Sequence, residues 1–356
     1  MTDSAIQSPT AEDPLDQAYR RLRSAGQRVA FELPGGSGWA TSHRAMTEVL
    51  DEASLVKNAP YRTNLREGLS AADRPMRALT DLEHLRSRDG ADHRRLRRTI
   101  NKAFTPARIA ALQPRIDEIA TELMDNFPAG ETVDLVAYFT TPLPIRVSCE
   151  LFGIPQADQW WIKTWTMTIL SETSTGEQAR TAMQSMIAYL AELLDRKRRA
   201  PGDDMTSALA ADRSGDLTDE ELVDMLRVVI VAGHETAVRL LGSAVIMLSA
   251  HPEQLATARW ENRWADVVEE TLWHESSDAD VFDIGRDDRD QPVFGRGPHI
   301  CLGAPLARLE ARVALAALYG RFPGLELGCA REDIEYIPQL TTAKPVALPV
   351  RLASVI

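Results

Sequence analysis

Hydrophobic and polar positions follow helical spacing over most of the chain. Apolar residues recur every three or four positions, which is typical of helices that bury one face. Short apolar or β-branched runs between glycines and prolines predict only a few strands. The pattern therefore predicts a fold that is mainly α with small β-sheets. The expected helices lie at 13–26, 44–50, 93–108, 109–123, 143–152, 158–170, 181–199, 217–250 and 306–322, and the expected strand pieces at 29–31, 39–41, 133–136, 346–350 and 351–352.

The stretch 217–250 predicts the longest helix and the most deeply buried one. Thr218, with Glu221 three residues on, forms a capping-box sequence at its start. Residues 228–231 are all apolar, and a helix that is apolar on every side lies in the middle of a protein.

The centre of this helix is polar, at Ala232-Gly233-His234-Glu235-Thr236. Buried polar groups are costly unless they serve a purpose. Gly233 would let a ligand lie against the backbone. Thr236 can bond back to a carbonyl and open the helix locally, and Glu235 can relay protons. The alternative is a capped kink in a core helix.

A glycine-rich loop at 294–303 carries Cys301 and leads directly into a helix-forming run. Free N–H groups at a helix N-terminus favour a thiolate. Such a thiolate could be a nucleophile, a zinc ligand or a haem ligand, and a buried structural cysteine is the further alternative. Zinc is disfavoured because Cys149 and Cys329 are isolated in the sequence. A nucleotide-binding loop is disfavoured because Gly295-x-Gly297 has no glycine at position 300.

A second informative stretch is the basic run at 93–108. Most runs of this kind are solvated helix faces. His93 and Arg97 are four residues apart, however, so both lie on one face of a helix. Such a pair can bind carboxylates through charge-assisted hydrogen bonds.

Composition and charge narrow the class of protein. The chain has 356 residues, 44% of them hydrophobic, and a formal net charge of -12, which argues against a nucleic-acid binder. Three scattered cysteines indicate a reducing compartment. The N-terminal residues are polar and lack an apolar signal region. We therefore expect a soluble, cytoplasmic protein that does not bind membranes, with a single domain over 1–356 whose residues 1–12 are disordered. We interpret the tryptophans at 160, 161 and 165 as core or pocket wall.

The string Phe-Gly-x-Gly-x-His-x-Cys-x-Gly-x-x-Leu-Ala-Arg, at 294–308, resembles the haem-binding loop of the cytochromes P450. The basic run resembles the P450 helix that holds the haem propionates, and Ala-Gly-His-Glu-Thr resembles the oxygen-activation helix. The resemblance extends from 13 to 352 and implies the P450 fold and haem b (iron protoporphyrin IX). It implies these site residues: Cys301 as the iron ligand; His93, Arg97, Arg296 and His299 on the propionates; Phe294, Gly295, Gly297 and Gly303 in the loop; Ala232 and Gly233 beside the haem; Thr236 and Glu235 in proton delivery.

The function that this resemblance implies is a haem-thiolate monooxygenase. It would oxidise a small organic, secondary-metabolite substrate with O2. Electrons would come from a ferredoxin and its reductase, and a basic patch beside the haem would suit an acidic ferredoxin. The alternative is a degenerate P450-fold protein that activates a partner enzyme such as a glycosyltransferase.

Two departures from the family pattern favour that alternative. Glu270 aligns with the glutamate of Glu-x-x-Arg, but Trp273 replaces the arginine, as in some actinobacterial members, and Val281 replaces a second arginine. Arg286 is a candidate substitute by its nearness in the sequence. Only 27 residues separate Trp273 from Cys301, so a block of strands and a short helix is missing before the cysteine loop.

Overall fold

The computed structural model describes residues 29–33, 37–40, 43–51, 85–130, 132–171, 174–211, 217–276, 281–287, 290–337 and 344–352. The expected helix at 13–26, the expected disorder at 1–12 and most of the join expected near 276–278 lie outside these residues. The helices are α2 His43–Asp51, α5 Gly90–Ala103, α6 Pro106–Ala111, α7 Gln113–Asp125, α8 Pro142–Phe152, α9 Gln159–Leu170, α10 Gly176–Arg199, α11 Met205–Ala210, α12 Asp219–Ala250, α13 Pro252–Trp260, α14 Trp264–Ser276 and α15 Ala304–Arg321.

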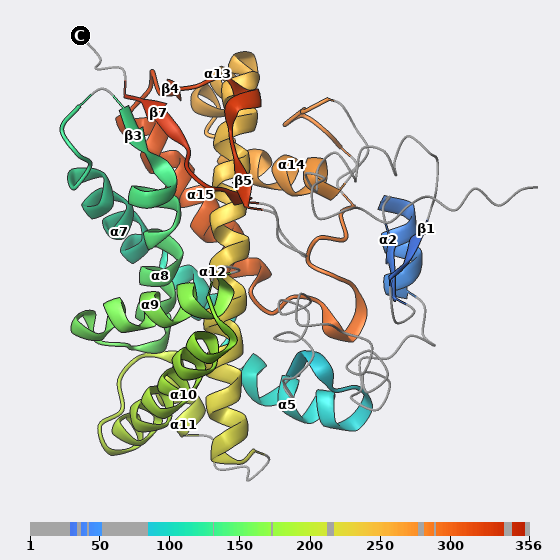
Figure 1. The fold of residues 1–356 in the computed structure, drawn as a ribbon, viewed down its shortest axis with the longest axis vertical. Coiled ribbons are helices and arrows are strands. Elements are labelled where there is room, and N and C mark those ends of the chain that lie inside the picture. The colour runs from blue at the N-terminus through green and yellow to red at the C-terminus, as the bar shows by residue number, and fades with distance from the viewer. Residues whose placement is uncertain are drawn as a thin grey trace, which may run out of the picture.

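Helix α12 is the axis of the fold (Figure 1). In that view α7 to α10 lie on one side of it, and α2 and α5 lie on the other. The predicted capping box is confirmed, because Thr218 Oγ1 accepts from Glu221 N at 3.2 Å and Thr218 N donates to the Glu221 carboxylate at 3.0 Å. Capping of this kind contributes about 0.5–2 kcal/mol to stability.

Among the described residues, α12 alone is long and apolar enough to span a bilayer. The interior of the protein covers 61% of its most apolar window. The helix packs against α8, α10, α14 and α15, as expected for the central helix of a globular core.

The strands form three small sheets in the described part of the chain. Strand β3 (Thr132–Asp134) and strand β4 (Glu326–Leu327) both pair antiparallel with β7 (Pro349–Arg351). The strand pieces predicted at 346–350 and 351–352 correspond to this one strand, β7. The other antiparallel pairs are β1 (Val29–Leu33) with β2 (Ser37–Ala40) and β5 (Tyr336–Ile337) with β6 (Lys344–Pro345).

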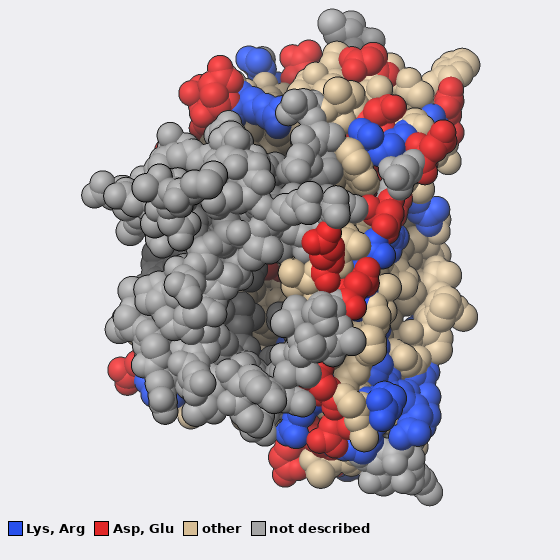
Figure 2. All heavy atoms as spheres, turned by 90° about the vertical axis from the view of Figure 1, so that its right-hand side faces the viewer, with Lys and Arg blue, Asp and Glu red and all other residues tan. Residues whose placement is uncertain are grey.

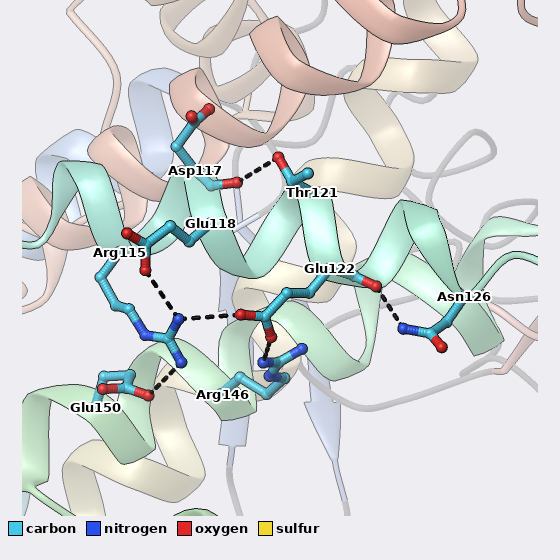
Figure 3. A network of polar contacts seen from close by, with 8 residues as sticks. All are labelled: Arg115, Asp117, Glu118, Thr121, Glu122, Asn126, Arg146 and Glu150. Carbon is cyan, nitrogen blue, oxygen red and sulfur yellow. Dashed lines mark hydrogen bonds and ion pairs between the residues drawn. The ribbon is translucent and has the colours of Figure 1, made fainter.

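An ion-pair network fixes α7 against α8 (Figure 3). The Arg115 guanidinium contacts Glu118 at 3.0 Å, Glu122 at 3.2 Å and Glu150 of α8 at 3.0 Å. Arg146 of α8 pairs with the second oxygen of Glu122. Individual exposed pairs contribute little, but a network holds the register of two helices better than a single pair does.

The tryptophans of α9 depart from the interpretation as core. Trp165 packs against the core, whereas Trp160 and Trp161 are exposed. The rings of Trp161 and Trp165 stack at 5.9 Å between centroids. Their exposure excludes the core for Trp160 and Trp161, since helical spacing alone does not say which face meets the core, and their role as a pocket wall stays a prediction.

Candidate active site

The loop that carries Cys301 is held by backbone geometry that needs glycine. Gly295 and Gly297 have φ of 73° and 64°, in the region that side chains disfavour. Cys301 N donates to Phe294 O at 2.7 Å and closes the loop. Helix α15 begins at Ala304, so the exposed thiol lies just before a helix N-terminus, as predicted. A Cβ added at Gly303 would lie 3.8 Å from the sulfur, so this glycine leaves room beside it.

Helix α5 supplies the cationic and imidazole groups near this thiol. Burial of the guanidinium lowers the pKa of Arg97, and Cys301, which lies within electrostatic reach, opposes that shift. The His93 and His299 rings lie 4.0 Å apart between centroids, and His299 Nε2 is 2.9 Å from Asp89 Oδ1. The structure thus brings together four predicted site residues from segments about 200 positions apart.

Two other predicted residues of the loop have protein partners. Arg296 pairs with Asp290, a carboxylate of the same loop. The guanidinium of Arg308 lies 4.6 Å from the centroid of the Phe294 ring. The propionate role of Arg296 and the position of Phe294 beside the sulfur stay predictions.

The middle of α12 opens onto free space. Ala232, Gly233 and Thr236 are exposed although this stretch of the helix lies among buried residues, and a Cβ at Gly233 would meet no atom of the described residues within 4 Å. Thr236 Oγ1 donates to Ala232 O at 3.0 Å, which confirms the predicted bond to a carbonyl. The helix nevertheless continues unbroken through this point, so the expected local opening is not present. This face can lie against a flat ligand.

The neighbouring Glu235 is buried and has a cationic partner. Its carboxylate forms an ion pair with Lys344 of β6, and both side chains are 7% exposed. Sequence analysis missed Lys344, because a lysine in a two-residue strand far along the chain carries no local signal.

Glu270 keeps a cationic partner despite Trp273. Its side chain is fully buried, and Arg286 binds it through two contacts, Nε to Oε2 at 2.9 Å and Nη2 to Oε1 at 3.2 Å. Asp283 N also donates to Oε1 at 2.8 Å. The Arg286 guanidinium lies 3.6 Å from the centroid of the Trp273 ring, a cation–π contact. The suggested substitution of Arg286 for the missing arginine is confirmed, and Trp273 supports the guanidinium.

Helix α15 contains a buried carboxyl that makes stability depend on pH. Burial raises the pKa of Glu310 to about 8, and Oε1 has no hydrogen-bond partner among the described residues. The unfolded chain ionises this group above about 4.5, so unfolding is favoured increasingly from pH 4.5 to 8.

We therefore expect Glu310→Gln to stabilise the protein at pH 8.5 by roughly 3–5 kcal/mol, and to have little effect at pH 4.5. Urea unfolding at both pH values measures the difference. Glu253→Gln, at an exposed position of α13, is the control and should change stability by less than about 0.5 kcal/mol. An equal gain at both pH values would contradict the assignment.

The side chains of this site fit a haem that is held by one thiolate. Among the described residues there is no cluster of three or more His, Cys, Asp or Glu side chains that could hold a metal ion. The exposed Cys301, the cationic face of α5 and the open face of α12 are the features that a flat, dianionic cofactor requires. The fold is mainly helical, and its exposed thiol, its basic helix and the open face of α12 are suited to one flat cofactor.

Comparisons with known proteins identify the family. No family model matches the chain. It is 32% identical to cytochrome P450 107B1 of Saccharopolyspora erythraea, with 94% of each chain covered. It is 35% identical to the mycinamicin IV hydroxylase/epoxidase of Micromonospora griseorubida, with 75% of this chain and 79% of that protein covered. The solved structure of CYP154C4 from Streptomyces sp. W2061 superposes with a TM-score of 0.84 at 33% identity, covering 95% of each chain.

The chain belongs to the cytochrome P450 family, as bacterial P450 relatives over nearly its whole length show. It is an enzyme of the P450 monooxygenase class, a class for which haem is the cofactor. The alignment with the Saccharopolyspora protein is 380 positions long, which exceeds the length of the chain, so gaps open on this chain's side.

Proposed function

We propose that this chain is a haem-thiolate monooxygenase that binds haem b through Cys301 and oxidises a small organic molecule. One observation carries the proposal. The exposed thiol of Cys301 lies beside the cationic face of α5, while α12 exposes Ala232, Gly233 and Thr236 in the middle of a buried stretch.

The residues that would hold the cofactor come from α5 and the cysteine loop. Cys301 would bind the iron, and Gly303 leaves room beside the sulfur. His93, Arg97 and His299 would bind the propionates. Arg296 would bind them too, either while it stays paired with Asp290 or after it leaves that carboxylate. When bound, a thiolate-ligated haem supplies dioxygen activation, because the thiolate donates electron density that favours O–O cleavage.

The residues of α12 would position the reactants and move protons. Ala232 and Gly233 leave the helix flat enough for a cofactor and a small molecule to lie against it. The Thr236 hydroxyl, which now donates to Ala232 O, would instead donate to dioxygen. Glu235 would take protons from water and release them toward Thr236.

Electrons would come from a ferredoxin and its reductase. Arg94, Arg98 and Lys102 are exposed on α5, the helix that packs against the cysteine loop. Figure 2 shows Lys and Arg side chains at the lower end of the described surface, with some acidic side chains among them. A basic surface on an otherwise acidic protein favours an acidic electron donor.

The substrate would be a secondary metabolite. The Micromonospora relative is named as a hydroxylase and epoxidase of mycinamicin IV. The shortened segment before the cysteine loop would leave one wall of the substrate site more open than in longer relatives.

The degenerate, partner-activating alternative loses one of its two supports. It rested partly on an unpaired Glu270, and Arg286 pairs with that carboxylate. Asp283 N donates to the Glu270 carboxylate, and this bond holds the short segment at 281–286 against α14.

An absorption spectrum of the purified, dithionite-reduced protein, with and without carbon monoxide, tests the proposal. We expect the Soret shift of thiolate-ligated iron. Adding ferredoxin, reductase and NADPH should then give oxygen-dependent NADPH consumption. A folded protein that binds no added haem would overturn the proposal and restore the partner-activating alternative.

A further inference from the structure

A pocket lies between helices α14 and α15, which pack against each other. Its volume is about 260 Å³, below the roughly 300–1,000 Å³ of sites for drug-sized ligands, so it suits a smaller molecule. The lining residues recur at every third or fourth position of each helix, which places them on the two faces that meet. They are Ala265, Val268 and Glu269 of α14 and Pro305, Arg308, Leu309 and Arg312 of α15.

The floor of this pocket is apolar, and its mouth is open to water. Val268 and Leu309 are buried, whereas Ala265 and Pro305 are exposed. The small side chain of Ala265 leaves the way to the buried pair open. An apolar group that enters the pocket therefore removes apolar surface from water, which contributes about 25 cal/mol for each Å² covered.

Two arginines line the pocket, and they differ in how their charge is balanced. Arg308 binds both carboxylate oxygens of Glu269, with Nη2 to Oε2 at 3.1 Å, so these two charges neutralise each other. Arg312 has no carboxylate partner among the described residues, and its Nη2 donates to the neutral amide oxygen of Gln113 at 3.1 Å. A guanidinium has several further N–H donors. The pocket thus carries one excess positive charge with free hydrogen-bonding capacity.

We propose that this pocket binds a small organic monocarboxylate, with its carboxylate on Arg312 and its apolar body on Val268 and Leu309. The ligand class is a simple aromatic or short-chain aliphatic acid. One excess charge matches a monoanion, whereas a second carboxylate would lie near Glu269 and be repelled by it. The inference goes beyond the proposed monooxygenase function and does not depend on it, because the lining residues are distinct from those that would hold the cofactor.

Fluorine NMR of the purified protein with para-fluorobenzoate tests the proposal. We expect saturable broadening of the fluorine signal as the protein binds the probe. The neutral analogue para-fluorobenzyl alcohol should bind about tenfold more weakly, because its hydroxyl cannot form a charge-assisted pair with Arg312. The competing explanation is a water-filled gap between two helices, which predicts no saturable binding of either probe.

Three variants locate the binding site. Arg312→Gln removes the charge and should weaken binding of para-fluorobenzoate about tenfold, with the binding of the alcohol unchanged. Ala265→Phe fills the mouth from an exposed position and should abolish binding of both probes. Arg321→Gln, at an exposed position of the same helix α15, removes an arginine that does not line the pocket and should leave binding unchanged. Urea unfolding of each variant verifies that it is folded.

Glu269→Gln tests the charge balance directly. The change frees Arg308 from its carboxylate partner, so the pocket gains a second unbalanced positive charge. We expect para-fluorobenzoate to bind roughly threefold more tightly. A fluorinated phthalate, which carries two carboxylates, should bind this variant but not the wild-type protein.

No saturable binding to the wild-type protein, or equal binding to wild type and Arg312→Gln, would overturn the proposal. Binding that is lost in Arg97→Gln and kept in Arg312→Gln would place the acid beside α5 and would overturn it as well. None of these results changes the thiolate-type spectrum that tests the proposed function, so the two proposals fail independently.

Discussion

Cys301→Ala is expected to abolish the thiolate-type Soret shift completely and to reduce oxygen-dependent turnover to background. The physical reason is that the sulfur of Cys301 is the single thiolate donor of this loop, and alanine provides no ligand in its place. The thiol is exposed, so its removal creates no core cavity. The unfolding free energy of the haem-free variant should stay within about 0.5 kcal/mol of wild type. A lost spectrum in a normally stable protein can then be assigned to ligation.

Two variants sharpen this test. Cys301→Ser keeps the shape of the side chain but offers a hydroxyl in place of a thiolate, and it should lose the same shift. Cys329→Ala removes a partly buried cysteine from another part of the chain and should leave the spectrum unchanged. A thiolate-type spectrum that survives in Cys301→Ala, or disappears in Cys329→Ala, would contradict the ligand assignment.

Arg286→Met is expected to destabilise the fold by about 3–5 kcal/mol, because it leaves the fully buried carboxylate of Glu270 without its cation. The change also removes the cation–π contact with Trp273 and the bond from Nη2 to Val281 O at 2.9 Å. Urea unfolding of the haem-free protein measures the loss. Haem retention should fall as well, since 281–286 leads into the cysteine loop.

The pair can be tested by a double-mutant cycle. Glu270→Gln combined with Arg286→Met removes both charges, so it should cost less than the sum of the single changes. Trp273→Arg in the Arg286→Met background should restore part of the stability, because residues 270 and 273 are neighbours on one helix face. Arg259→Met, at an exposed position of α13, is the matched control, with an expected loss below about 1 kcal/mol. Additive losses in the cycle would show that Arg286 acts independently of Glu270.

Features that depend on neighbouring residues could be predicted before the fold was known. The capping box and the apolar run of α12 depend on residues a few positions apart, and the structure has them as predicted. The cysteine loop is also local, since its glycines permit the positive φ angles at 295 and 297. The spacing of His93 and Arg97 placed them on one helix face, and the contact of the His93 and His299 rings agrees with the expected meeting of α5 and the loop.

Contacts between groups far apart in the chain could be found only from the folded structure. Nearness in the sequence made Arg286 a candidate for Glu270, but its guanidinium could stack on Trp273 and reach the carboxylate only after the short segment folded back onto α14. The pairing of Lys344 with Glu235 could not be predicted, because the partner of a buried lysine depends on where its strand packs against the helix. Local propensity determines whether a segment forms a helix or a strand and how its side chains are spaced. Loop length and packing determine which other elements it contacts. Buried charges are therefore paired by the fold, and their pairing cannot be derived from local patterns.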